Sequence, residues 1–195
     1  MKKGLFITIY GINNIGKSTH AKRLVERLKK LGKKAVYIKY PIYDLAPTGP
    51  FLDKVLRHSK KQKMPEEELQ LWFVLNRYQF QPKLKKMLAA GTTVIAEDYV
   101  GTGIAWGVAK GASFEELETM NTFLVQSDCS ILMDGKRAVE ATERGHLHES
   151  NRTLIDKCQK VFRTLANKYH WKKVQVAEDP DVTAARLWKI VRKCV

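Results

Sequence analysis

A short stretch bounded by two glycines, near the start of the chain, constrains the fold more than any other feature. Residues 11–18 read Gly-Ile-Asn-Asn-Ile-Gly-Lys-Ser and match the pattern G-x-x-x-x-G-K-[ST]. The apolar, β-branched run 5–10 precedes them, and residues 17–31 follow with apolar side chains at helical spacing before Gly32. A buried strand, a glycine turn and a helix in this order form the context in which the pattern binds phosphate.

The residue types in this turn, a P-loop, suit a nucleoside triphosphate and its metal ion. We expect the nucleotide to be bound by Gly11, Asn13, Asn14, Ile15, Gly16, Lys17, Ser18 and Thr19. Backbone N–H groups and the helix N-terminus attract phosphate oxygens, Lys17 can reach the transferred phosphate, and the Ser18 hydroxyl can bind Mg²⁺. A chance glycine turn on a basic helix is the alternative, which the flanking strand and helix disfavour.

Strands and helices continue to alternate along the rest of the chain. We expect four more strands, at residues 35–40, 92–96, 130–133 and 174–177. We expect helices at 51–58, from Pro65 to Gly91, from Ser113 to about Val125, around 137–143, up to Tyr169 and after Pro180. This alternation predicts a single P-loop domain over residues 1–195, an α/β fold with a doubly wound, five-stranded parallel sheet and helices on both faces.

The composition adds a strong positive charge. Lys and Arg number 35 against 20 Asp and Glu, which gives a formal net charge of +15. The basic residues are spread along the helices, so an anionic ligand or a solvated surface explains them better than nucleic-acid binding does. The first apolar run is too short for a signal peptide or a membrane span, and the three cysteines lack metal-ligand spacing. We therefore expect a cytoplasmic protein without a membrane partner.

Two residues of the long helix suit a flat ligand with a polar edge. Phe73 and Arg77 are four apart and share one helix face, and Asn76 with Arg77 interrupts an apolar stripe. A ring can stack on a base while a guanidinium donates hydrogen bonds to the edge of that base. The alternative is that Phe73 belongs to the core and that Arg77 is solvated.

Several segments, in order over nearly the whole chain, resemble the thymidylate kinases, P-loop enzymes that phosphorylate thymidine monophosphate (dTMP) from ATP. These segments are residues 11–19, Tyr40 with Pro41, residues 71–78 with an aromatic-x-x-Asn-Arg pattern, residues 97–106 and the loop that begins at Arg144. The resemblance implies that Phe73 stacks on thymine and that Arg77 bonds its edge. It also implies Mg²⁺ with ATP, and a homodimer packed through the long helices.

The polar loop at about 143–152 lies where the family has a lid that closes on ATP. An arginine must usually reach the transferred phosphate, and the P-loop here carries none. Arg144 and Arg152 are therefore the catalytic candidates, and some thymidylate kinases likewise place this arginine in a helical lid. A solvated basic loop is the alternative. His146 and His148 lack a well-placed third ligand, which disfavours a metal there.

The chain departs from the family pattern at several positions. Asn13 stands where many members have Asp, and Tyr43 where some have an Arg for the acceptor phosphate. Glu97 and Asp98 replace the usual Asp-Arg, and a carboxylate at Asp98 would repel the acceptor phosphate or point elsewhere. Glu97 ends a parallel strand, so it can still hold Mg²⁺ or orient the acceptor, unless it only caps the next turn.

These departures leave the acceptor open. Fewer acceptor-side cations favour a neutral acceptor, so a deoxynucleoside kinase with Glu97 as the base toward a sugar hydroxyl is the second hypothesis. A non-catalytic P-loop protein that binds nucleotide or nucleic acid is the third. The ordered resemblance favours the monophosphate kinase, for which Lys39, Arg57 or Arg77 can supply the missing charge. We expect the acceptor pocket to be lined by Pro41, Phe73, Arg77, Tyr99 and Thr102, although the last two also suit an ordinary turn.

Overall fold

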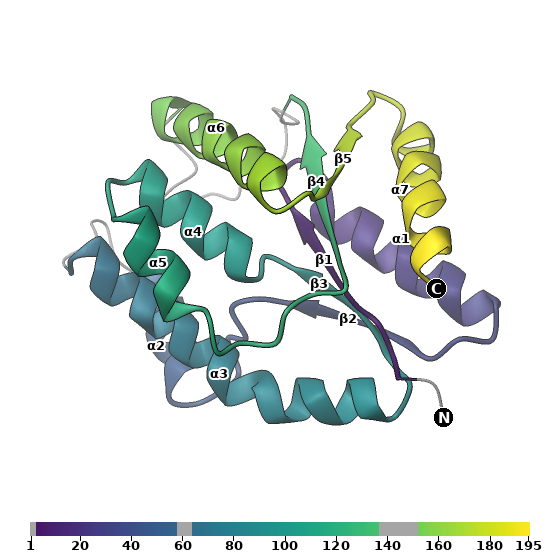
Figure 1. Ribbon diagram of the computed structural model, residues 1–195, viewed down its shortest axis with the longest axis horizontal. Coiled ribbons are helices and arrows are strands. Elements are labelled where there is room, and N and C mark those ends of the chain that lie inside the picture. Colours follow the sequence, from purple (N-terminus) through teal and green to yellow (C-terminus); the bar gives the residue numbers. More distant parts are fainter. Residues whose placement is uncertain (1–2, 58–63, 137–151) are drawn as a thin grey trace.

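The alternating order of strands and helices is confirmed by the computed structural model, which describes residues 3–57, 64–136 and 152–195 (Figure 1). The strands are β1 (Phe6–Tyr10), β2 (Ala35–Lys39), β3 (Thr93–Glu97), β4 (Cys129–Asp134) and β5 (Lys172–Gln175). The helices are α1 (Lys17–Lys30), α2 (Thr48–Arg57), α3 (Glu66–Ala89), α4 (Val100–Ala109), α5 (Phe114–Met120), α6 (Arg152–Lys168) and α7 (Pro180–Cys194).

The five strands form one parallel sheet, as expected. Their order in the sheet is β2-β3-β1-β4-β5. β1 and β3 are buried along their whole length, which explains why their sequences are continuous apolar runs without alternation. From β1 the chain builds first toward β2 and β3 and later toward β4 and β5. The loops that follow β1 and β3 therefore open into a crevice at the carboxyl edge of the sheet, the usual ligand position in such folds.

Helices cover both faces of the sheet, which confirms the doubly wound arrangement. α1 packs against α7 on one face, while α3, α4 and α6 lie over the other (Figure 1). α2 and α5 pack against α3 and complete the second layer. None of the helices within the described ranges is long and apolar enough to cross a bilayer.

Four elements differ from the sequence-based expectations. β5 spans Lys172–Gln175 and so begins two residues before the expected strand at 174–177. α4 was not predicted, and Tyr99 and Thr102 suited an ordinary turn; the chain turns at Asp98 and Tyr99 and is helical from Val100. α2 begins at Thr48 rather than at Phe51. α5 is capped by Ser113 as expected but ends at Met120 instead of near Val125, because the amide of Asn121 donates to the Leu117 carbonyl at 2.7 Å.

The expected helix at 137–143 and most of the lid loop, Arg144 included, lie outside the described residues. Arg152 is the first residue of α6.

Candidate active site

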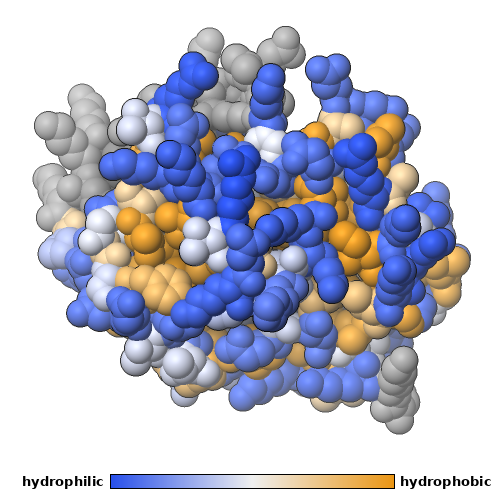
Figure 2. Space-filling model, turned by 45° about the horizontal axis from the view of Figure 1, so that its top comes forward, coloured by the Kyte–Doolittle hydropathy of each residue, from blue (hydrophilic) through white to orange (hydrophobic). Residues whose placement is uncertain are grey.

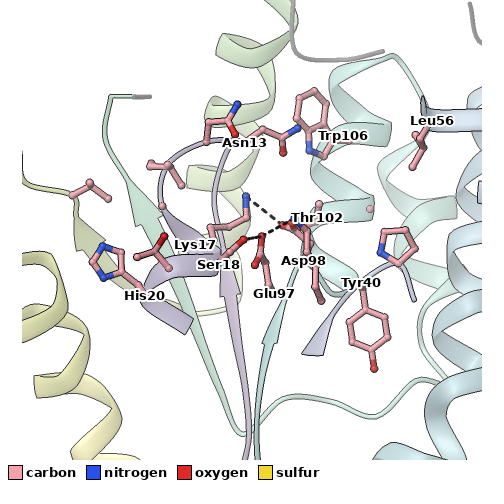
Figure 3. A pocket seen from close by; sticks show the side chains of 18 of the residues that line it. Asn13, Lys17, Ser18, His20, Tyr40, Leu56, Glu97, Asp98, Thr102 and Trp106 are labelled. Atoms are coloured by element: carbon pink, nitrogen blue, oxygen red, sulfur yellow. Dashed lines mark hydrogen bonds and ion pairs between the residues drawn. The ribbon is translucent and has the colours of Figure 1, made fainter. Parts of the chain in front are cut away.

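A cavity of about 950 Å³ opens where the carboxyl ends of β1 and β3 face the first turn of α1 (Figure 3). The expected site residues that line it are Asn13, Asn14, Ile15, Gly16, Lys17, Ser18, Thr19, Pro41, Phe73, Arg77, Glu97 and Thr102. The structure thus brings the expected phosphate site and the expected base site into one cavity. From the side at which the strands end, the surface is largely hydrophilic, with apolar patches between the polar side chains (Figure 2).

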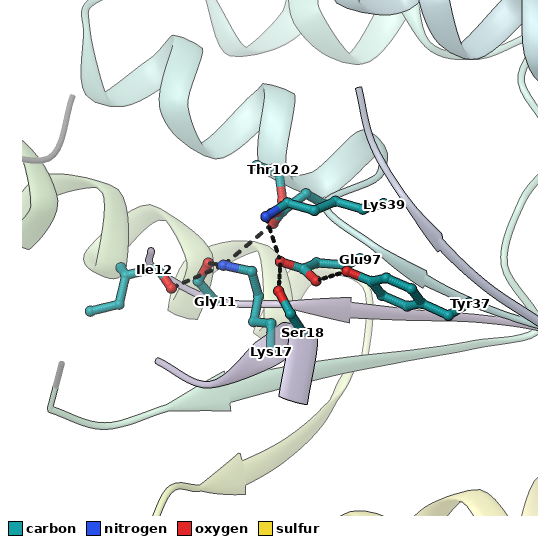
Figure 4. Close-up of polar contacts among 9 residues, drawn as sticks. Gly11, Ile12, Lys17, Ser18, Tyr37, Lys39, Glu97 and Thr102 are labelled. Carbon is teal, nitrogen blue, oxygen red and sulfur yellow. Dashed lines mark hydrogen bonds and ion pairs between the residues drawn. The ribbon is translucent and has the colours of Figure 1, made fainter. Parts of the chain in front are cut away.

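The turn before α1 holds its lysine through backbone carbonyls. Gly16 has a left-handed φ of 93° at the N-cap of α1, a conformation that glycine adopts without a Cβ penalty. Lys17 Nζ donates to the carbonyl oxygens of Gly11 at 2.9 Å and Ile12 at 3.0 Å (Figure 4). A buried ammonium group and the positive end of a helix therefore converge on one point, which suits phosphate oxygens.

Ser18 and Glu97, the two expected metal ligands, lie next to each other (Figure 4). Ser18 Oγ donates to Glu97 Oε1 at 3.0 Å, the Tyr37 hydroxyl donates to Oε2 at 2.5 Å, and Lys39 Nζ lies 3.4 Å from Oε1. Burial alone would raise the pKa of Glu97, but Lys17, Lys39 and the hydroxyl donors outweigh it and hold that pKa below its ordinary value. The carboxylate is therefore ionised at neutral pH.

The oxygen donors of Ser18 and Glu97 fit Mg²⁺, which binds proteins through one or two oxygen side chains and takes further ligands from phosphates. Among the described residues there is no group of three or more His, Cys, Asp or Glu side chains that could hold a metal ion by itself. A metal at this point would therefore depend on the phosphates of the nucleotide for the rest of its ligands.

Asp98 points toward the phosphate-binding lysine. Its Oδ1 accepts the Thr102 hydroxyl at 2.9 Å and lies 3.6 Å from Lys17 Nζ (Figure 3). Burial raises the pKa of Asp98 to about 6, and the attraction of Lys17 opposes this while the repulsion of Glu97 adds to it. The sequence left open whether the Asp98 carboxylate faces the site or points away from it. It faces the site.

The base end of the cavity is built from α3. Phe73 is half-buried and lines the cavity, together with Trp106 of α4. Arg77 is buried and its Nη2 donates to Asn121 Oδ1 at 3.1 Å, so the solvated alternative for Arg77 is wrong. Burial lowers the pKa of Arg77 to about 10, against the influence of neighbouring tyrosines, and the guanidinium remains charged at neutral pH. A stacking ring and a charged donor therefore face the same space.

Comparison with protein families accounts for this combination. The model of the thymidylate kinase family matches residues 9–185, which include the P-loop, the face of α3 that carries Phe73 and Arg77, and the end of β3. The chain belongs to the thymidylate kinase family.

Related thymidylate kinases cover nearly the same length. The chain is 29% identical to the thymidylate kinase of Caenorhabditis elegans over 200 residues, which cover 97% of this chain and 90% of that protein. It is 25% identical to the human thymidylate kinase over 183 residues, with 91% and 84% covered. Among solved structures, the thymidylate kinase from Candida albicans superposes with a TM-score of 0.81 at 22% identity, covering 98% of this chain and 92% of the other, and so has the same fold.

Three expected residues of this thymidylate kinase family member, Gly11, Tyr99 and Arg152, are not among the described residues that line the cavity. Gly11 instead accepts a hydrogen bond from Lys17 through its carbonyl oxygen. Tyr99 is buried in the core, where its ring centroid lies 5.0 Å from those of Phe6 and Tyr40. It therefore contributes packing under the site instead of a wall of the acceptor pocket. Arg152 is exposed at the start of α6 and is not among the described residues that line the cavity.

Several residues of the cavity wall were not predicted from the sequence. Gln70, Gly103, Trp106 and Lys110 border its base end, and the segment 175–178 borders the side near the P-loop. Gln70 carries a signal that could have found it, since it precedes Phe73 by three residues and shares its helix face. The other residues come from α4 and from the segment after β5, and only the folded chain brings them to α3 and the P-loop.

Proposed function

We propose that this protein is a thymidylate kinase that transfers the γ-phosphoryl group of ATP to dTMP and yields dTDP and ADP. Membership of the thymidylate kinase family supports ATP-dependent phosphorylation of dTMP. The observation that carries the proposal is the single cavity of about 950 Å³, into which both the P-loop and the base-binding face of α3 open. Phosphoryl transfer depends mainly on positioning and charge neutralisation, and a shared cavity allows both.

On the donor side, the backbone N–H groups at the start of α1 and the ammonium group of Lys17 bind the phosphates of ATP. Ser18 and Glu97 are the residues that would hold Mg²⁺, and the ion, when bound, neutralises charge on the phosphates. Glu97 is kept ionised and fixed by Tyr37 and Lys39, so it is ready to bind the metal or to orient the acceptor oxygen.

On the acceptor side, Phe73 stacks on the base and Arg77 donates to its edge. We assign the monophosphate to Lys39 and Arg57, which both line the cavity. Lys39 Nζ lies 3.4 Å from Glu97 Oε1, and the Arg57 guanidinium lies 4.5 Å from the centroid of the Tyr43 ring. These two cations would replace the arginine that some family members have at the position of Tyr43.

Arg144 and Arg152 complete the proposed catalytic set from the sequence alone. Each carries a guanidinium that can stabilise charge on the transferred phosphate if the loop 143–152 closes over ATP, and closure also excludes water. Together with Lys17 and Glu97, they are the residues to which we assign roles in catalysis.

A homodimer packed through α3 is part of the proposal. α3 exposes three apolar side chains at spacings of four and three residues, Leu71, Leu75 and Tyr78. The centroids of the Tyr78 ring and the exposed Phe123 ring lie 5.4 Å apart. An apolar helix face of this kind suits burial against a second copy.

We also place the protein in the cytoplasm. Its cysteines, Cys129, Cys158 and Cys194, are free thiols, and free thiols are typical of a reducing compartment.

The proposal is tested by measuring ADP release from ATP and Mg²⁺ with a panel of nucleosides and nucleoside monophosphates. We expect turnover with dTMP, and a loss of roughly a thousandfold or more in Lys17→Ala, because a charge on the transferred phosphate is left unbalanced. Lys30→Ala, at the exposed end of the same helix, is the matched control and should retain activity.

Two other results would each contradict the proposal in a recognisable way. Phosphorylation of thymidine without phosphorylation of dTMP would identify a deoxynucleoside kinase. ATP binding without turnover on any acceptor would identify a non-catalytic P-loop protein, and a steep salt dependence of oligonucleotide binding would then point to a nucleic-acid partner.

A further inference from the structure

A buried chain of three polar side chains holds one amide at the base end of the cavity. Gln70 is 2% exposed, and its Nε2 donates to Glu66 Oε1 at 2.7 Å. Lys110 Nζ, at the end of α4, donates to Glu66 Oε2 at 2.9 Å. Both oxygens of the Glu66 carboxylate are therefore engaged, one by each neighbour. Gln70 and Lys110 both line the cavity.

This network decides which end of the Gln70 amide faces the cavity. A carboxylate accepts hydrogen bonds and does not donate them, so the NH₂ group of Gln70 must turn toward Glu66. The carbonyl oxygen then points the other way, toward Gly103 of α4. A Cβ atom at Gly103 would lie only 2.9 Å from Gln70 Oε1. Lys110 strengthens this preference, because its ammonium group donates to Glu66 Oε2 and so leaves Oε1 to accept from Gln70.

The acceptor of Gln70 lies close to the donors of Arg77. The same Cβ atom at Gly103 would lie 3.2 Å from Arg77 Nη2 and 3.4 Å from Nη1, so both side chains approach the bare backbone of one glycine. Phe73, which borders the same cavity, lies between them in the sequence and shares their helix face. A base that stacks on the Phe73 ring would therefore turn its edge toward one acceptor and one charged donor.

We propose that Gln70 Oε1 and Arg77 together read the base, with Gln70 accepting from N3–H and Arg77 donating to O4 of a keto pyrimidine. This inference rests on the proposed function, because it needs a pyrimidine monophosphate in the cavity. Thymine and uracil carry a donor at N3 beside an acceptor at O4. Cytosine carries the opposite pair, so it would place acceptor against acceptor and donor against donor. Glu66 and Lys110 act through Gln70 and are positioning residues.

The preference for thymine over cytosine that follows is large. A ligand without the N–H leaves the buried polar groups of the site unpaired, and this costs binding free energy. A Gln70→Met variant keeps the volume of the side chain and removes its acceptor. We expect the preference for dTMP over dCMP, measured as the ratio of kcat/KM values, to fall at least about tenfold in this variant, while the KM for ATP stays unchanged.

A substrate that lacks the N3 proton gives a second and more direct readout. N3-methylthymidine monophosphate cannot donate to Gln70, so the wild-type protein should discriminate against it more strongly than Gln70→Met does. Glu66→Gln should weaken the dTMP preference as well, since an amide at residue 66 no longer fixes the orientation of the Gln70 amide. Gln81→Met is the matched control. Gln81 is buried on the same helix, but its Oε1 accepts from the Val125 N–H, and it does not line the cavity.

Calorimetric binding of dTMP and dCMP separates this inference from the proposed function. Equal affinity of the wild-type protein for the two nucleotides, or an unchanged preference in Gln70→Met, overturns the inference even where dTMP is phosphorylated. Preferential dTMP binding that depends on Gln70, without turnover, supports the inference and contradicts the proposed kinase. We expect Gln81→Met to lose thermal stability but to keep the wild-type preference.

Discussion

At the scale of single residues, Lys39 and Arg57 are the cations to which we assign the charge balance of the acceptor side. Lys39 is the last residue of β2 and forms an ion pair with Glu97. Arg57 is the last residue of α2, and its guanidinium lies over the Tyr43 ring. Neither residue belongs to the P-loop. Removal of either charge should therefore weaken the binding of an acceptor phosphate more than the binding of ATP, which Lys39 affects only through its ion pair with Glu97.

We predict that Lys39→Met raises the KM for dTMP about tenfold, because one partly desolvated charge pair with the phosphate is lost. Arg57→Met should change the KM in the same direction. Steady-state kinetics with dTMP and ATP varied in turn provide the measurement, and Lys54→Met, an exposed lysine of α2 outside the cavity wall, is the control. An equal rise in the KM values for ATP and dTMP would remove Lys39 from the acceptor site.

Residues of the candidate site were predictable where one segment carries them. The P-loop lies in one turn, and Phe73 and Arg77 lie four apart on one helix, so spacing alone places them. Gln70 and Asp98 were harder, because their roles depend on partners that are remote in sequence. The orientation of the Gln70 amide is set by Glu66 and Lys110, and Asp98 points at Lys17 only because β3 ends beside β1.

At the scale of secondary-structure elements, most of the fold follows from hydrophobic patterns and α4 does not. The central strands are continuous apolar runs, and α1 has a periodic apolar face. α3 is set by Pro65 at its start and Gly91 after its end, so these elements were predicted within a few residues. α4 contains three glycines, Gly101, Gly103 and Gly107, which disfavour a helix in isolation. The helix forms because it packs against α3, α5 and α6, and its glycines let side chains such as Gln70 and Arg77 approach the backbone.

Asp134 joins the end of β4 to α6 and makes a testable contribution to stability. Its two carboxylate oxygens accept from Arg163 Nε at 2.8 Å and Nη2 at 3.1 Å, and Gln159 Nε2 donates to Oδ1 at 2.8 Å. Burial tends to raise the pKa of Asp134, but these donors, Arg163 above all, hold that pKa below its ordinary value of 3.8. The ionised form is thus favoured in the folded protein.

We predict that Asp134→Asn lowers the free energy of unfolding at pH 7 by about 1 kcal/mol, a modest figure because Arg163 is half exposed. A carboxyl whose pKa is lower in the folded state stabilises the fold at every pH above its unfolded-state pKa. This contribution is lost as the pH falls through the folded-state pKa. Urea unfolding at pH 7 and at a series of pH values below 3.8 follows the loss of this contribution, and Asp156→Asn, an exposed aspartate of α6, is the control. A deficit that is equal at all of these pH values would argue against the ionic contribution.

At the scale of the whole molecule, the exposed apolar face of α3 is the surface through which we propose that two copies of the chain form a dimer. Leu71, Leu75 and Tyr78 lie on the helix that also carries Phe73 and Arg77 toward the cavity. A second copy packed on this face would therefore stabilise the helix to which we assign base binding. Assembly and acceptor affinity would then change together.

We predict that the protein has about twice the mass of its 22.4 kDa chain in solution, and that Leu75→Glu reduces it to a monomer. A carboxylate in the centre of an apolar interface has no partner and costs several kcal/mol. Size-exclusion chromatography with light scattering gives the mass. Leu31→Glu places the same charge on an exposed leucine after α1 and should leave the assembly unchanged. A wild-type mass of one chain would contradict the dimer.

The carboxylate of Asp98 also gives a means of selective inhibition. It faces the cavity beside Thr102, at a position where the usual pattern of the family has an arginine. A competitive inhibitor with a basic amine at this point would form an ion pair with this protein and would be repelled by relatives that keep the arginine. An inhibitor with an acidic group there would show the reverse preference. Asp98, in place of the usual arginine, would thus allow an inhibitor to distinguish this enzyme from relatives that keep the arginine.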